Sequence, residues 1–130
     1  MPFLSLKTIL LADAAACLAM GALLIAGASP LAAVTEIPAA LSTWAGVLLL
    51  PVAAFIAAAA FRFSHMTAMA GTIILGNIAW IVASMALLVM DLIAPNAFGT
   101  AFIIAQALAV AVLTWLETTA VARRFHAHSA

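Results

Sequence analysis

The sequence predicts an all-α membrane protein, a transmembrane four-helix bundle with both termini on the cytoplasmic side. The first observation is composition: 69% of the 130 residues are hydrophobic and 6% are charged, whereas soluble domains carry about 25% charged residues. The second is that four apolar stretches each reach the roughly 20 residues that a helix needs to cross a bilayer. The third is the position of the cations, which fall on one side of these four crossings.

The same composition excludes several other classes of protein. Four Lys and Arg balance four Asp and Glu, so no basic face is available for nucleic acid. The single cysteine excludes an internal disulfide framework. The spans lack the polar–apolar alternation of a transmembrane barrel. We therefore expect one integral membrane domain over residues 1–130, with the lipid bilayer as a partner and no nucleic acid.

The four predicted spans are joined by short connections. Turn signals stand at residues 29–30 (Ser-Pro) and 37–38 (Ile-Pro) in the first connection, and at 94–96 (Ala-Pro-Asn) in the third. The second connection, residues 62–65, is so short that we expect the second and third helices to pack as antiparallel neighbours. The spans cover approximately residues 8–28, 41–61, 66–90 and 97–122.

The charged residues outside the spans predict the orientation. After an even number of crossings all the basic residues lie on one side, and two acidic residues fall in or beside the opposite loops. The positive-inside rule then places both termini in the cytoplasm. The basic residues are Lys7, Arg62, Arg123 and Arg124, and the acidic ones are Glu36 and Asp91.

Small residues at helical spacing predict where the helices touch. Lipid tails are as apolar as leucine, so membrane helices associate through close packing of small residues and through hydrogen bonds. In the first span the expected contact faces are Ala12-Ala16 and Cys17-Gly21; in the third they are Ala68-Thr72-Gly76 and Ala79-Ala83.

Asp13 and Glu117 are the ionisable residues predicted within the membrane, where a charge at the centre costs at least about 2.5 kcal/mol. Each lies six residues from a cation, Lys7 or Arg123, which is about 9 Å along a helix. If the first and fourth helices touch, the two acids could face each other and share a proton, as in proton-coupled transport. The alternative, which we favour, is that they reach the interface or pair with Lys7, Arg123 or Arg124.

Asn77 and Gln106 are predicted nearer the bilayer middle. An unpaired amide is unfavourable in hydrocarbon, so we expect them to bond across the bundle, to each other, to Ser84, to Thr72 or to a backbone carbonyl. Polar stripes on the third and fourth helices could line a path to the cytoplasm, although a purely structural role is favoured. The candidate intramembrane polar site comprises Asp13, Asn77, Gln106, Thr114 and Glu117.

No catalytic or cofactor constellation is recognised in the sequence. There is no pairing of nucleophile and base and no metal-ligand spacing. His65, His126 and His128 lie outside the predicted spans, where they are poorly placed to hold haem. We expect no enzyme activity, no cofactor and no metal.

Part of the chain resembles a known group of proteins. The stretch LGNIAWIVAS at residues 75–84 is similar to the third helix of small bacterial four-helix integral membrane proteins without assigned function. The end of the fourth span, with Gln106, Glu117 and the Arg123-Arg124 pair, is similar as well. The resemblance covers roughly the C-terminal half. It implies a compact bundle in a bacterial cytoplasmic (inner) membrane, and it brings no activity.

Three functions are open at this point. The first, which we favour, is a non-enzymatic structural or accessory protein that acts through helix contacts with itself or with a larger membrane complex. The second is a small oligomeric proton-linked transporter that uses Asp13 and Glu117. The third is a binder of an apolar ligand such as a quinone, lipid or pigment, with Trp80 and Asn77 as contacts.

Overall fold

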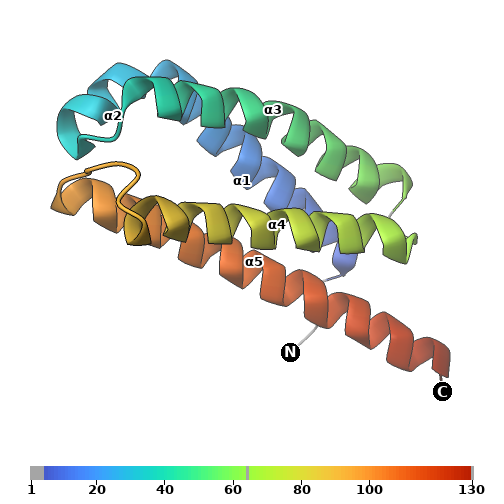
Figure 1. Cartoon of the computed structure of the whole chain (residues 1–130). Coiled ribbons are helices and arrows are strands. Elements are labelled where there is room, and N and C mark those ends of the chain that lie inside the picture. Colours follow the sequence, from blue (N-terminus) through green and yellow to red (C-terminus); the bar gives the residue numbers. More distant parts are fainter. Residues whose placement is uncertain (1–4, 64, 130) are drawn as a thin grey trace.

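The computed structural model describes residues 5–63 and 65–129, and for residues 125–129 the backbone only. The side chains of His126 and His128 therefore lie outside the described residues. The described chain is helical, with five helices and no strand (Figure 1). They are α1 (Leu6–Ala26), α2 (Ala28–Thr35), α3 (Ala39–Arg62), α4 (Thr67–Val89) and α5 (Ala97–Ser129).

Four of these helices are long and apolar enough to cross a membrane: α1, α3, α4 and the Ala97–Arg124 part of α5. At 1.5 Å per residue, the 21 residues of α1 match a hydrocarbon core of about 30 Å. The prediction of four apolar helices is thus confirmed, and they indicate a multi-pass membrane protein. The bundle arrangement and the orientation stay predictions.

The helix α2 corrects the prediction of a turn at residues 29–30. Pro30 stands in the first turn of α2, where the backbone N–H has no helical acceptor in any case, so the proline does not break the helix. The helix ends at Thr35, and the capping residue Glu36 adopts a left-handed conformation with φ 58°. The first connection is therefore mostly helical.

The spans associate as two pairs, α1 with α3 and α4 with α5 (Figure 1). At the crossing of α1 and α3 a Cβ atom on Gly46 would lie 2.7 Å from the carbonyl oxygen of Gly21. Only glycine permits this approach, so the predicted contact face at Gly21 is confirmed. The prediction that α3 and α4 pack as neighbours is wrong, because they make few close approaches. A short loop joins their ends but does not dictate how the rest of each helix packs.

The two pairs are held together toward each end of the molecule. At the end where α1 begins, a core of buried residues draws on all four long helices and includes Leu10, Ile56, Ile73 and Ala120. At the other end α2 docks on the loop before α5. There the backbone N–H of Asn96 donates to the Thr35 carbonyl at 3.0 Å, and the Asn96 side-chain amide donates to the Val34 carbonyl at 2.7 Å. We call this contact of Val34 and Thr35 with Asn96 the clasp.

Candidate functional site

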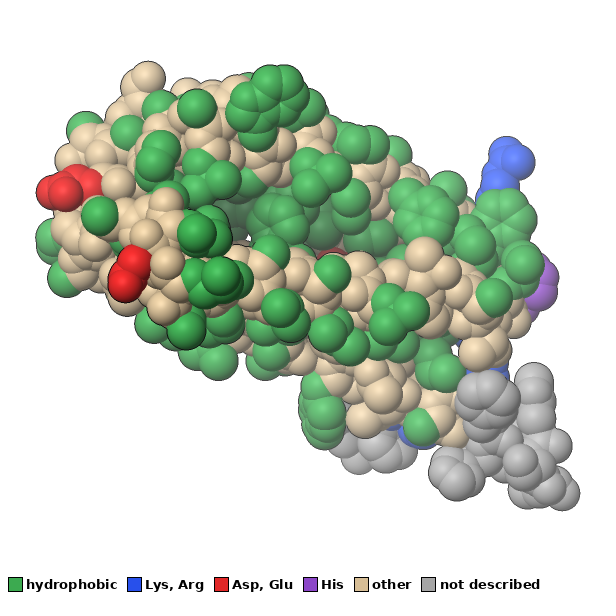
Figure 2. Space-filling model, viewed as in Figure 1, with side chains coloured by type: hydrophobic (Ala, Val, Ile, Leu, Met, Phe, Trp, Pro, Cys, Tyr) green, Lys and Arg blue, Asp and Glu red, His purple; other side chains and the backbone are tan. Residues whose placement is uncertain are grey.

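A groove runs between the two helix pairs, in the stretch between the core and the clasp. It encloses about 510 Å³ and is lined by residues of α1, α3, α4 and α5. Figure 2 shows it as a hollow with hydrophobic walls and a small acidic area at its base. We call this cavity the main groove. Its wall on α3 is bulky, with Leu48, Val52 and Phe55, whereas α4 contributes small residues such as Gly76 and Ala79 beside the large ring of Trp80.

The small residues of α4 widen the groove instead of packing against a neighbouring helix. A Cβ atom on Gly76 would meet nothing within 4 Å. Thr72, Ala79 and Ala83 line the groove with it. The prediction that Gly76 belongs to a helix contact face is therefore wrong within this chain. The residue types were recognised, but small residues serve a contact or a cavity equally well, and spacing does not separate the two.

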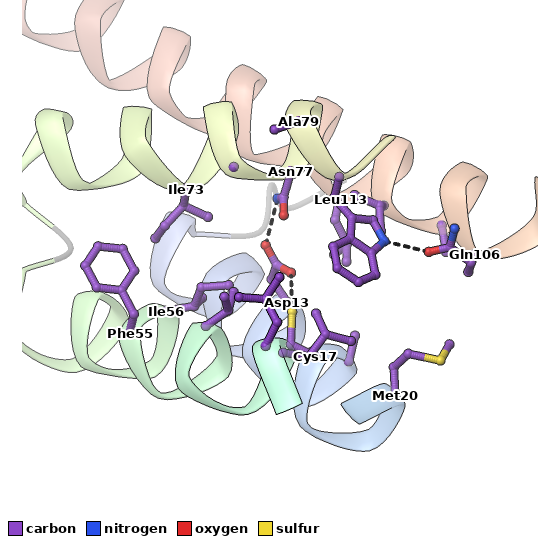
Figure 3. A pocket seen from close by; sticks show the side chains of 18 of the residues that line it. Asp13, Cys17, Met20, Phe55, Ile56, Ile73, Asn77, Ala79, Gln106 and Leu113 are labelled. Carbon is purple, nitrogen blue, oxygen red and sulfur yellow. Dashed lines mark hydrogen bonds between the residues drawn. The ribbon is translucent and has the colours of Figure 1, made fainter. Parts of the chain in front are cut away.

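Asn77 brings together the two acids of the membrane region. Its side-chain nitrogen donates to Asp13 Oδ2 at 3.0 Å and to Glu117 Oε1 at 2.8 Å, so α1, α4 and α5 meet at one amide. Both acceptor oxygens bond to the same nitrogen, so the distance between them cannot exceed the sum of the two hydrogen-bond distances. We call these three residues the carboxyl cluster. Figure 3 shows Asn77 pointing at Asp13 from the opposite wall of the groove.

The carboxyl cluster is buried and its described contacts are with uncharged groups. The exposed fraction is 2% for Asp13, 8% for Asn77 and 0% for Glu117. The Cys17 thiol donates to Asp13 Oδ1 at 3.6 Å. Glu117 Oε2 is buried without a hydrogen-bond partner. Since the Asn77 amide has two hydrogens and donates twice, it has no further donor for that oxygen.

The two acids differ in their access to the groove. Asp13 and Asn77 line the main groove, whereas Glu117 lies behind them and does not line it. Asp13 is therefore the acid that a molecule in the groove would meet first.

Lys7, one of the cations predicted as alternative partners of the acids, contacts an aromatic ring instead. The Lys7 ammonium lies over the ring of Phe61, 5.4 Å from its centroid. The Nη1 atom of Arg124 is buried without a hydrogen-bond partner. Asp13 is thus held by Asn77 and Cys17 while Lys7 contacts an aromatic ring.

A second polar network lies further along the groove. The Trp80 indole N–H donates to Gln106 Oε1 at 2.8 Å, and Gln106 Nε2 donates to Ser84 Oγ at 3.0 Å (Figure 3 shows the first of these bonds). Gln106 Nε2 also donates to the Ile103 carbonyl at 2.9 Å. This network ties α4 to α5.

Trp80 and Gln106 stand where two cavities meet. A second cavity of about 360 Å³ continues from the main groove toward α2. Both cavities are lined by Met20, Leu48, Trp80, Ala83 and Gln106. The tryptophan ring is thus the bulkiest side chain at the junction.

The five predicted site residues separate into three groups. Asp13, Asn77 and Glu117 form one cluster, and Gln106 joins Trp80 and Ser84 instead of Asn77. The Thr114 hydroxyl donates to the Val110 carbonyl of its own helix at 2.7 Å, and this threonine lines neither cavity.

Two features escaped the sequence prediction: the bond of Asn77 to both acids, and the groove itself. Counting residues from the helix ends places Asn77 deeper than Glu117. Side chains lean toward the N-terminus of their helix, and α4 and α5 run in opposite directions. The Asn77 amide and the Glu117 carboxyl therefore lean toward each other and close that difference in depth.

Within the part of the chain that the structure describes, no group of three His, Cys, Asp or Glu side chains is placed to hold a metal ion. In comparisons with known proteins, no family model, curated protein or solved structure matches this chain. The resemblance to small bacterial membrane proteins therefore stays a prediction, and the functional argument depends on the groove and the carboxyl cluster.

Proposed function

We propose that this protein binds a mostly apolar ligand of the bilayer in the main groove. The observation that carries the proposal is the cavity: about 510 Å³, within the roughly 300–1,000 Å³ of small-molecule sites. Its walls are apolar, and a few polar groups converge in it, namely Asp13, Asn77, Trp80 and Gln106. This combination is typical of sites that take an apolar body and orient it by one polar group.

A route from the lipid supports the same proposal. The groove lies between α3 and α4, which make few close approaches, and its hydrophobic hollow faces outward in Figure 2. Leu48 and Phe55 of the wall are 54% and 40% exposed. A membrane-dissolved molecule could enter sideways between these helices without crossing water.

Quenching of Trp80 fluorescence tests the proposal. Trp44 and Trp115 are 72% and 65% exposed, so both are replaced by Phe to leave Trp80 as the reporter. A brominated long-chain alcohol, added to the protein in detergent, should quench Trp80 with a saturable component. Gly76→Leu should weaken that component because the new side chain occupies part of the groove.

Gly71→Leu is the matched control. Gly71 lies on the same helix, and a Cβ atom there would also meet nothing within 4 Å. It does not line the groove. This variant should keep the saturable quenching. Equal quenching in both variants, or quenching that never saturates, would contradict the proposal.

Proton-linked transport is a second candidate function, and the carboxyl cluster favours it. Acids inside the membrane pair with each other or with polar groups and mark proton relays in transporters. Here α1 and α5 each contribute one acid to a single amide on α4. Asp13→Asn and Glu117→Gln should then abolish proton-linked flux across the membrane of liposomes. Proton-linked flux that is fully retained in both variants would exclude this function.

We also propose that the chain lies in a bacterial cytoplasmic membrane with both termini inside. Acidic side chains mark one end of the molecule and basic ones the other (Figure 2). The basic end carries Lys7, Arg62 and the Arg123-Arg124 pair, which the positive-inside rule assigns to the cytoplasm. A structural or accessory role, through contacts with another copy or a larger complex, stays a prediction. Purification in native detergent tests it, and a strictly monomeric protein without a co-purifying partner would count against it.

A further inference from the structure

We propose that the ligand of the main groove is a lipophilic cation, and that its binding displaces a proton held by the carboxyl cluster. The inference rests on the proposed function, since it names the chemical class of the ligand for that same groove. It is carried by the juxtaposition of Asp13, at the groove wall, with a second buried acid behind it.

The charge of the carboxyl cluster favours a bound proton. Two carboxylates bonded to one amide in a low-dielectric region repel each other, and Asn77 supplies no charge to offset them. The cluster is therefore stable with a proton on one of its acids. A ligand cation that reaches Asp13 can take the place of this proton, which leaves to water. One positive charge enters and one departs, so the net charge of the occupied region is unchanged.

Among the described residues that line the groove, no side chain is basic. From α1, the titratable groups that face the site are Asp13 and the Cys17 thiol; from α5 it is Glu117, through Asn77. The residues that α3 and α4 contribute to the groove lining are uncharged. The negative potential of the cluster is therefore not offset by any groove-lining side chain, and this site favours a cation over an anion.

The shape of the groove walls favours a cation with a large apolar body. A small hydrated cation would leave the apolar surfaces of α3 and α4 without a partner and would lose its water at high cost. A cation with a large apolar body instead fills these walls. Phe55 and Trp80 line the groove, and aromatic faces attract cations that have been desolvated. Figure 3 shows Phe55 and Asp13 among the side chains that line the groove, with Ile56 between them in this view.

A pair of ions of nearly equal shape and opposite charge tests the inference. Tetraphenylphosphonium and tetraphenylborate are titrated separately into the protein in detergent, by calorimetry in buffers with different heats of ionisation. The phosphonium should bind and release one proton per cation, and the borate should not bind. Proton and cation compete for the same site. The apparent Kd of the phosphonium should therefore fall about tenfold for each unit by which the pH is raised, as long as the cluster is still protonated.

The variant Asp13→Asn should weaken phosphonium binding by about tenfold or more and abolish proton release. Glu36→Gln is the matched control, because Glu36 is an exposed acid at the far end of the molecule. It should bind like the parent protein. Circular dichroism and gel filtration of both variants show whether the fold is intact. If Asp13→Asn does not fold, the borate comparison and the proton count on the parent protein decide.

The outcomes separate this inference from the proposed function. Equal binding of the two ions, or phosphonium binding without proton release, overturns the cation inference. If the brominated alcohol still quenches Trp80 in the Gly76-dependent way, the groove remains a site for neutral apolar ligands. If Gly76→Leu changes neither quenching nor phosphonium binding, both the proposed function and this inference fail.

Discussion

Asn77 joins the two buried acids through a single side-chain amide. Its amide donates to an acid on each of two other helices, and it is 8% exposed. An amide suits this position because it supplies two hydrogens from one nitrogen and carries no charge. A lysine would place a positive charge beside the acids, and a leucine would leave Asp13 Oδ2 and Glu117 Oε1 without this donor.

We expect Asn77→Leu to lower the free energy of unfolding by about 1–3 kcal/mol, because two buried acceptors lose their donor. The measurement is thermal or denaturant unfolding in detergent. Thr114→Val is the matched control, since the Thr114 hydroxyl bonds only to the Val110 carbonyl of its own helix. That variant should change stability little. Similar losses in both variants would mean that Asn77 does not stabilise the helix contacts.

At the scale of the helices, α1 and α3 form the tightest pair, and α4 and α5 form the second. The first pair approaches closely because glycine faces glycine at the crossing, at Gly21 and Gly46. The second pair is joined by the hydrogen bonds of Trp80, Gln106 and Ser84. These are the two means of association available to helices in lipid, close packing and interhelical hydrogen bonds.

Gly46→Ala should destabilise the α1–α3 pair, because the added methyl group would lie 2.7 Å from the Gly21 carbonyl oxygen. Overpacking of this kind costs about 1–3 kcal/mol. Gly71→Ala, where the methyl group meets nothing within 4 Å, should not reduce stability. Thermal unfolding of the two variants in the same detergent compares them directly. A Gly46→Ala protein as stable as the Gly71→Ala protein would contradict the close crossing.

Gly99→Ala tests the clasp between α2 and the start of α5. A Cβ atom at Gly99 would overlap the Thr35 carbonyl oxygen and lie 2.6 Å from Pro95 Cβ. The expected result is separation of α2 from α5, seen as faster proteolysis of the connection at residues 34–38. Unchanged proteolysis would show that the clasp tolerates the methyl group. Gly71→Ala, where the methyl group meets nothing within 4 Å, controls for the same change of residue at an open position.

At the scale of the whole molecule, the core at one end and the clasp at the other hold two helix pairs around a central groove. The arrangement places its polar contacts inside, and many large apolar side chains face outward. Exposed residues such as Leu18, Leu75, Val82 and Leu108 would be unfavourable in water and are suited to lipid. The groove is therefore lined by the four helices that are long and apolar enough to cross a membrane.

Cysteine labelling tests the proposed orientation of the whole chain. In a Cys17→Ala background, Glu36→Cys and His65→Cys each introduce one thiol at an exposed position near opposite ends of the molecule. A membrane-impermeant maleimide added to intact bacterial cells should label position 36 and not position 65. Labelling of position 65 alone would invert the topology. Labelling of both would show that they lie on the same side.

Much of the architecture could be predicted because it depends on local properties of the chain. A run of about 20 apolar residues specifies a spanning helix, whichever other helices it contacts. The same reasoning placed Asp13, Asn77 and Glu117 inside the apolar region. It also placed Gly21 at a helix contact, where the structure has it against Gly46.

The helix α2 shows where local reasoning fails within a single connection. The pair Ser29-Pro30 favours a turn, yet Pro30 in the first turn of a helix costs no hydrogen bond. In the structure residues 28–35 are helical, and the end of this helix docks on Asn96. This contact joins segments 61 residues apart, so no short window of sequence contains it.

The sequence by itself determined that the helices are suited to lipid and not to water. It also determined the number of apolar helices and which polar side chains they contain, because hydropathy is summed over neighbouring residues. Only the tertiary structure decided which helices pair, that Asn77 bonds to both acids, and that small residues of α4 border a cavity. The bonds of Asn77 join residues 64 and 40 positions apart. They depend on how each helix is rotated and how it crosses its neighbours, and in lipid no hydrophobic difference between helix faces encodes that rotation.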